Sequence, residues 1–350
     1  MERRTSWMRI AVLLATGSAT ALAACGGAPE PVEEPAVEET AERPAGAGTI
    51  ETLDPALDAL VPADAEIEHL AEGFGFTEGP AWISGDEPFL LFSDIPGNRI
   101  VKWTPAGEVS DFLAPVFEGE AEEGRLSGSN GITVGPDGSV VFTEHFNGRV
   151  SSIAADGSDR SIVVDNYEGG RFNSPNDLAY KSDGSLYFTD PAYGLPTPED
   201  RAQDVNGIYR LDPDGTLTRL ADQEGPNGIA FSPDESRLYV ADSSAGFWMA
   251  YDVAEDGSLG EGALLLDASG VDAPGAPDGL KVDTQGNLWA TGPGGVWVIA
   301  PDGRHLGTIK PTEVPANVAW GDDGQTLYMT ARTGLYRIRV SATGTLPGPM

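Results

Sequence analysis

The chain has 350 residues, of which 55 are Asp or Glu and 21 are Lys or Arg, so its formal net charge is −34. This much negative charge argues against nucleic acid or an anionic membrane surface as a partner. The single cysteine excludes an internal disulfide.

Residues 1–24 are typical of an export signal rather than of a folded segment. A basic start is followed by the apolar residues 10–24, which are too short to span a bilayer, since that takes about 20 helical residues. The run Leu-Ala-Ala ends at Cys25, which predicts cleavage before Cys25 and a lipid on its thiol. The alternative is ordinary cleavage that leaves a spare thiol. With Gly26 following, we expect an exported lipoprotein of the cell envelope, in the outer membrane and facing the periplasm.

Residues 25–60 are rich in Pro, Ala and Glu and carry few large apolar side chains. Such a segment cannot bury a core, and we predict that it is a disordered acidic tether. The remaining residues 61–345 are enough for one large all-β domain.

A short motif recurs along residues 61–345 at intervals of about 45 residues: a Glu, Asn or Asp followed by an apolar strand. The leading residues are Glu78, Asn130, Asn176, Asn227, Asp278 and Asn317. A polar hairpin and a second strand follow each motif, then a third strand and often a fourth. Units of this length with about four strands are blades of a β-propeller. The sequence therefore predicts an all-β, six-bladed propeller.

The sixth unit ends near Val340 after three strands, whereas the strand-like run 66–72 precedes the first motif without a partner. We predict that this N-terminal strand closes the last blade.

The residue that enters the innermost strand of a blade lies at one mouth of the central channel, so the six leading residues should converge. All of them carry carboxylate or amide oxygens, which are the ligands of a hard cation such as Ca²⁺. We predict a divalent cation, Ca²⁺ before Zn²⁺, Mn²⁺ or Mg²⁺, because the three histidines form no ligand cluster. The alternative, that these residues only form turns, does not explain Glu78.

Other side chains near this mouth are candidates for substrate contact. Asn130 can donate a hydrogen bond, and His145 follows the second strand of its blade, next to Glu144. Tyr193 lies in a long insertion and could cover the site. Its alternative role is packing within that loop.

Several motifs, taken in order, carry a family resemblance. They include Glu78-Gly79-Pro80-Ala81-Trp82, Asn173-Ser174-Pro175-Asn176-Asp177, Pro226-Asn227-Gly228-Ile229-Ala230 and Pro277-Asp278-Gly279-Leu280-Lys281. From about residue 72 to 338 the chain resembles the gluconolactonase and regucalcin family, also called the senescence marker protein family.

The resemblance implies a six-bladed propeller with a divalent cation in its channel and hydrolysis of a small lactone as the activity. It implies that Glu78, Asn227 and Asp278 bind the metal, and that Asn176 joins them or contacts substrate. Asp278 matches the proposed acid/base of the family, although it could serve only as a metal ligand.

One position departs from the pattern. Animal members carry an arginine two residues before the equivalent of Asn176, whereas this chain has Ser174, so specificity for sugar lactones does not carry over. Two other functions stay open: a phosphotriester hydrolase, and a non-catalytic binding propeller with a structural cation.

Overall fold

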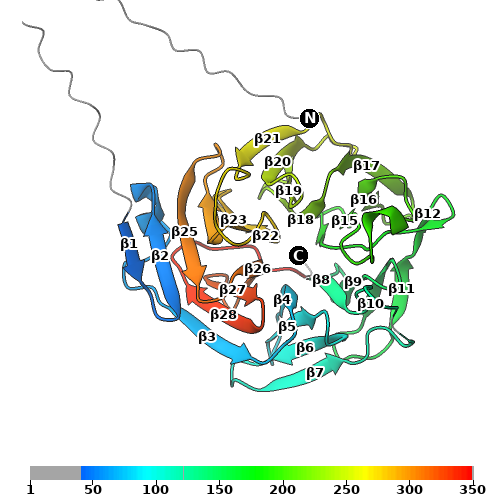
Figure 1. Ribbon diagram of the computed structural model, residues 1–350, viewed down its shortest axis with the longest axis horizontal. Helices are drawn as coiled ribbons and strands as arrows, with labels where there is room; N and C mark the ends of the chain where they lie inside the picture. Colours follow the sequence, from blue (N-terminus) through cyan, green and yellow to red (C-terminus); the bar gives the residue numbers. More distant parts are fainter. Residues whose placement is uncertain (1–40, 121, 349–350) are drawn as a thin grey trace, which may run out of the picture. The chain divides into compact units, whose positions relative to one another are not determined.

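The computed structural model describes residues 41–120 and 122–348. The predicted export signal, Cys25 and residues 25–40 of the predicted tether lie outside these residues. Six antiparallel sheets stand around a common axis (Figure 1). The predicted six-bladed β-propeller is confirmed. None of the helices described is long and apolar enough to cross a membrane.

In each of the first four blades the chain starts at the axis and runs outward strand by strand. Blades 1 and 2 comprise β4 (Thr77–Ile83), β5 (Phe89–Asp94), β6 (Arg99–Trp103) and β7 (Val109–Leu113), then β8 (Ser129–Val134), β9 (Val140–Glu144), β10 (Arg149–Ile153) and β11 (Ser161–Val164). Blades 3 and 4 comprise β14 (Leu178–Tyr180), β15 (Leu186–Asp190), β16 (Asn206–Leu211) and β17 (Leu217–Gln223), then β18 (Pro226–Phe231), β19 (Arg237–Asp242), β20 (Phe247–Asp252) and β21 (Ala263–Asp267). A short hairpin of β12 (Asn166–Tyr167) and β13 (Gly170–Arg171) joins blades 2 and 3, and a single turn, η2 (Pro198–Asp200), lies in the insertion of blade 3.

The last two blades both take strands from the N-terminal side of the chain. Blade 5 comprises β22 (Leu280–Val282), β23 (Leu288–Gly292), β24 (Gly295–Ile299) and β25 (His305–Pro311), and blade 6 comprises β26 (Pro315–Gly321), β27 (Thr326–Ala331) and β28 (Gly334–Arg339). Strand β3 (Ile67–Glu72) pairs antiparallel with β28, with Ala71 opposite Leu335. This confirms that the N-terminal strand closes the ring.

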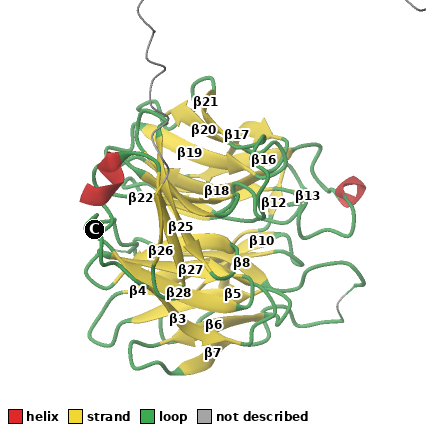
Figure 2. Cartoon of the chain, turned by 60° about the vertical axis from the view of Figure 1, so that its left-hand side comes forward, coloured by secondary structure: helices red, strands yellow, loops and turns green. Residues whose placement is uncertain are grey.

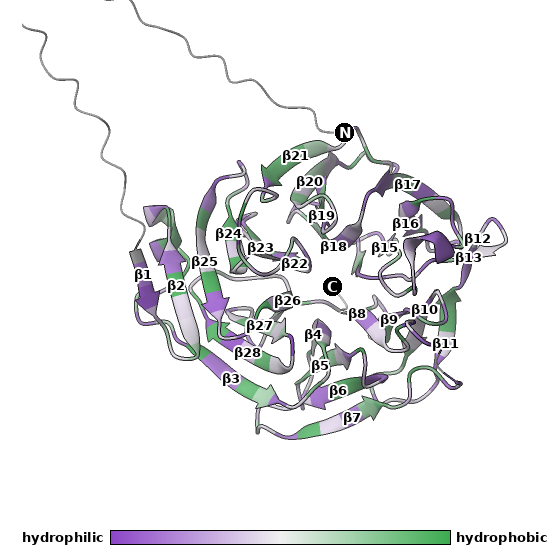
Figure 3. Ribbon diagram, viewed as in Figure 1, coloured by the Kyte–Doolittle hydropathy of each residue, from purple (hydrophilic) through white to green (hydrophobic). Residues whose placement is uncertain are grey.

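The prediction of a disordered tether as far as residue 60 is wrong for residues 41–60. Strands β1 (Ala41–Pro44) and β2 (Gly48–Thr52) form a hairpin on the outer edge of β25, with Ile50 opposite Ile309. The turn η1 (Pro55–Ala59) follows. The hairpin needs no core of its own, because Ile50, 1% exposed, packs into the core of blades 5 and 6. Strand β1, at the outer edge, is hydrophilic (Figure 3).

Large aromatic side chains fill the space between neighbouring blades. Trp82 of blade 1 stacks on Tyr328 of blade 6 at 5.4 Å between ring centroids. Trp289 of blade 5 meets Trp320 of blade 6 edge-on at 5.1 Å. Such aromatic pairs stabilise the fold by more than the burial of their apolar area alone would give. They pack neighbouring blades against each other around the channel. Figure 2 shows the strands of these blades in an oblique view.

The channel has two different ends, which we call the front mouth, where the inner strands begin, and the rear mouth, where they end. The C-terminal segment crosses the rear mouth, and the described part of it, as far as residue 348, lies near the axis (Figure 1). Thr284 N–H donates to Thr343 O and Gly344 N–H to Gly324 O, both at 2.8 Å. Residues 345–348, with the ends of the inner strands, enclose a cavity of about 370 Å³.

Candidate metal centre and active site

The inner strands come close together at the front mouth because small residues follow the leading ones. A Cβ on Gly79 would collide with Asn130 O of the next blade, and one on Gly228 would collide with Asp278 O. Gly131 N–H donates to Asn176 O at 2.8 Å. Glycine after the leading residue therefore allows neighbouring blades to touch backbone to backbone, which brings the leading side chains to one axis.

Hydrogen bonds between blades show which residues occupy equivalent positions. Thr143 Oγ1 donates to Asn176 O, and Thr189 Oγ1 donates to Asn227 O, both at 2.8 Å. In blade 5 the equivalent Thr291 Oγ1 donates to Ala316 O at 2.9 Å. The leading position of blade 6 is therefore Ala316.

The prediction that Asn317 leads blade 6 is wrong by one residue. Asn317 stands where blades 1, 2, 4 and 5 have glycine and blade 3 has Asp177. Its Oδ1 accepts from Val318 N–H at 2.8 Å, and its Nδ2 donates to Glu78 Oε2 at 2.9 Å. The side chain still belongs to the site, as a donor to Glu78.

Glu78 and Asp278 repel each other across the front mouth. Burial and the charge of Asp177 raise the pKa of Glu78 to about 7, although Asn317 and Gly79 N–H donate to it. Burial, Glu78 and Asp177 raise the pKa of Asp278 well above its usual range. Two carboxylates that interact in this way favour a proton or a cation between them.

Several buried oxygens at this mouth have no hydrogen-bond partner in the described part of the chain: Asn130 Oδ1, Asn227 Oδ1, Asp278 Oδ1 and Asp177 Oδ2. Buried acceptors without donors are costly, and a hard cation satisfies them. No three His, Cys, Asp or Glu side chains within 41–120 and 122–348 can hold a metal by themselves. The donor set fits a cation only when amide oxygens join the carboxylates.

Asn130 and His145 act as a pair. Asn130 Nδ2 lies 3.1 Å from His145 Nε2, and burial lowers the pKa of His145 to about 4. The neutral ring therefore accepts from the amide, which leaves Asn130 Oδ1 unpartnered. His145 is only 1% exposed, so it is better placed to orient Asn130 than to touch a substrate.

Of the other predicted residues, Asn176 and Asn227 are buried at the front mouth. Asn227 Nδ2 donates to Ser243 Oγ at 3.0 Å. Tyr193, 37% exposed, donates its hydroxyl to Gly225 O at 2.8 Å. The same hydroxyl lies 3.4 Å from Ser244 Oγ, and burial raises the pKa of Tyr193.

Ser174 holds the loop that carries Tyr193. Its Oγ donates to Pro191 O at 2.7 Å and accepts from Gly194 N–H at 2.9 Å. Arg171 does not replace the missing arginine, because its guanidinium donates to Phe146 O and Phe172 O. Sequence reasoning did not find this role for Ser174, and it also missed Asp177.

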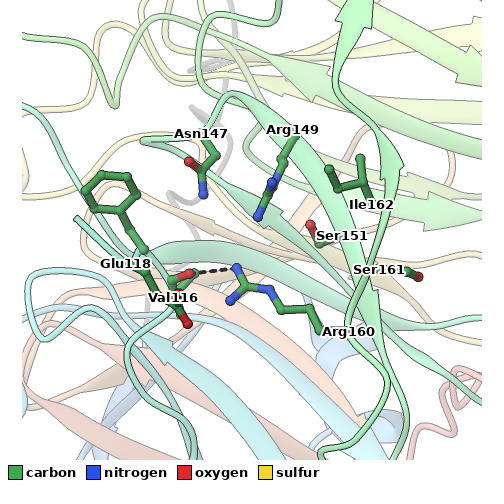
Figure 4. A pocket seen from close by; sticks show the side chains of 9 residues that line it. Val116, Glu118, Asn147, Arg149, Ser151, Arg160, Ser161 and Ile162 are labelled. Carbon is green, nitrogen blue, oxygen red and sulfur yellow. Dashed lines mark hydrogen bonds between the residues drawn. The ribbon is translucent and has the colours of Figure 1, made fainter.

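A cavity of about 340 Å³ on blade 2 is not part of this site. Arg149 and Arg160 line it (Figure 4), and both pair with Glu144 Oε1, at 3.0 and 2.9 Å. Arg160 also donates to Val116 O at 2.6 Å. Burial by itself would raise the pKa of Glu144, but its hydrogen bonds lower it. Both guanidinium groups are thus engaged by one carboxylate, and these ion pairs brace the blade.

Comparisons with known proteins agree with this architecture. Residues 76–333 match the family described as the SMP-30/Gluconolactonase/LRE-like region. A gluconolactonase of Zymomonas mobilis is 40% identical over 313 residues, which are 85% of this chain and 87% of that protein. A pentonolactonase of Haloferax volcanii is 30% identical over 76% of this chain and 91% of its own length. A solved gluconolactonase of Xanthomonas campestris superposes with a TM-score of 0.75 at 32% identity, covering 87% of this chain and 99% of that one. The chain belongs to the SMP-30/gluconolactonase/LRE-like family.

Proposed function

We propose that the protein hydrolyses a small lactone at the front mouth of the channel and that a divalent cation, Ca²⁺ first among the candidates, assists the reaction. The observation that carries the proposal is the meeting of Glu78 and Asp278 with buried oxygens that lack partners. Relatives that are 30–40% identical over most of this chain are named as lactonases.

Glu78, Asn227 and Asp278 would hold the cation, with Asn176 beside them. When bound, such an ion polarises an ester carbonyl and stabilises the charge that develops on its oxygen. The other steps fall to the chain itself. Asp278 takes the proton of the attacking water and returns it to the leaving alkoxide.

Two neighbouring groups would position the substrate. The neutral His145 holds Asn130 in one orientation, and Asn130 in turn contacts the substrate. Tyr193, tied at its hydroxyl to Gly225 O, offers a fixed aromatic edge at the mouth.

The test is a panel of sugar and aliphatic lactones, with a phosphotriester as a second class of substrate. We expect lactone turnover with Ca²⁺, Mn²⁺ or Zn²⁺, loss of turnover in chelator, and recovery when the ion is restored. Lactone turnover that persists in chelator would reject the metal mechanism. Chelation that lowers only the melting temperature, with no ester cleaved, would support a binding propeller with a structural cation.

We also propose that the protein is exported and anchored in the outer membrane through a lipid on Cys25. The support is the sequence of residues 1–25. Cys25→Ala should move the protein from the membrane fraction to the soluble fraction. An unchanged membrane fraction would argue against the anchor.

A further inference from the structure

One basic side chain stands inside the channel. Among the inner strands β4, β8, β14, β18, β22 and β26, as the structure describes them, Lys281 is the only Lys or Arg. The residues paired at the equivalent place in blades 1 to 4 are Ala81, Thr133, Ala179 and Ala230. An ammonium at this depth is therefore a feature of one blade and not of the repeat.

Lys281 reaches from blade 5 towards blade 3. Its Nζ lies 3.9 Å from Asp177 Oδ2 and donates to Leu280 O at 3.0 Å. Asp177 is 2% exposed, and its Oδ1 accepts from Leu178 N–H at 2.9 Å. Among residues 41–120 and 122–348, the ammonium is the only charged group that pairs with the Asp177 carboxylate.

The channel therefore holds three carboxylates, those of Glu78, Asp177 and Asp278, and one ammonium. Their formal charges sum to −2. Charges in a channel of low dielectric interact strongly over several ångströms.

We propose that Lys281, held across the channel by Asp177, is a built-in counter-charge that sets the preference of the ring for a divalent over a trivalent cation. The inference rests on the proposed cation site and names a residue outside its ligand set. With Lys281 in place, a 2+ ion neutralises the channel. Without it the formal charge is −3, which matches a 3+ ion.

The test compares the affinities of the full chain for Ca²⁺ and Tb³⁺, two ions of similar size, by calorimetry and competition. In Lys281→Met the ratio of Tb³⁺ to Ca²⁺ affinity should rise about tenfold, since the lost charge acts more strongly on the ion of higher charge. Asp177→Asn removes the opposite charge and should lower the ratio by a similar factor. The double variant should return it to the starting value, and Lys281→Arg should leave it unchanged.

Lys181→Met is the matched control. Lys181 also lines the rear cavity, but its ammonium pairs with Asp183 at 2.6 Å near the surface, so the ratio should stay constant. If folded Lys281→Met and Lys281→Gln bind both ions more weakly by the same factor, the role of Lys281 is merely structural and the inference is overturned. If the unchanged chain binds neither ion, the cation site and the inference both fail. If it binds Ca²⁺ but cleaves no lactone, only the proposed function fails.

Discussion

The two ends of the channel use the same residue type in opposite ways. Asp278 at the front mouth has a buried Oδ1 without a partner. Five residues later, at the rear, Asp283 accepts from Gln285 N–H, from Asn287 N–H and Nδ2, and from Trp289 Nε1, at 2.8–3.1 Å. A buried carboxylate with all its partners stabilises the fold, whereas one without them is available for chemistry.

Asp278→Asn should show the largest effect at the front. We expect turnover to fall about 10²- to 10⁴-fold, the usual contribution of an acid/base group. The free energy of unfolding at pH 7 should not fall, because the amide removes a carboxyl whose pKa is raised by burial and by the charges of Glu78 and Asp177. Initial rates and urea unfolding measure the two quantities. A folded variant with full activity would show that Asp278 is neither base nor essential ligand.

Asp283→Ala should show the reverse pattern at the rear. Its four hydrogen-bond donors would be left inside the protein, so the free energy of unfolding should fall by about 3 kcal/mol. Turnover per folded molecule should stay within about twofold. A large loss of turnover in molecules shown to be folded would mean that the two ends of the channel are coupled.

Addition of the cation should stabilise the folded protein only by binding at the front mouth. At about 100 times its dissociation constant, Ca²⁺ should raise the free energy of unfolding by about 2.7 kcal/mol. Thermal unfolding with Ca²⁺ and with chelator measures the gain. Asp278→Asn should abolish it and Asp283→Ala should keep it. Equal gains in both variants would place the ion elsewhere.

Stability and Ca²⁺ affinity should both depend on pH through Glu78 at the front mouth. Because the pKa of Glu78 is raised from 4.5 to about 7, the folded protein holds a proton that the unfolded chain releases. The contribution of this proton to the free energy of unfolding of the metal-free protein is therefore fully present below about pH 4.5 and is lost as the pH rises through about 7. Protons compete with the cation, so Ca²⁺ affinity should rise by up to about tenfold per unit until about pH 7. Calorimetry at several pH values measures this slope, and Glu78→Gln should flatten it.

The number of blades and the closing strand could be predicted from the sequence because each depends on a repeat. The leading residues recur with the apolar strands around them, and the run 66–72 had no partner of its own. The outer hairpin 41–52 could not be predicted, since its stability comes from the edge of β25 and not from its own composition.

The error at Asn317 has a physical cause. Its Asn-Val-Ala looks like the Asn-Gly-Ile-Ala of blade 4, but Asn317 takes the place of the glycine, and the leading residue is one position earlier. Counting back from β27, where Val318 pairs with Met329, would have revealed Ala316. Asp177 and Lys281 were missed because a pattern of shared residues hides the positions where a single blade differs.

The closure of the ring by β3 also orders events during synthesis. Residues 67–72 leave the ribosome early, yet their partners in β28 are residues 334–338. Pairings so distant in sequence form slowly, because a long loop must close first. Blades 1 to 4 can form from contiguous chain before β3 has a partner. A strand made before any of the blades is therefore among the last to pair, and the ring of a growing chain stays open until its final blade is made.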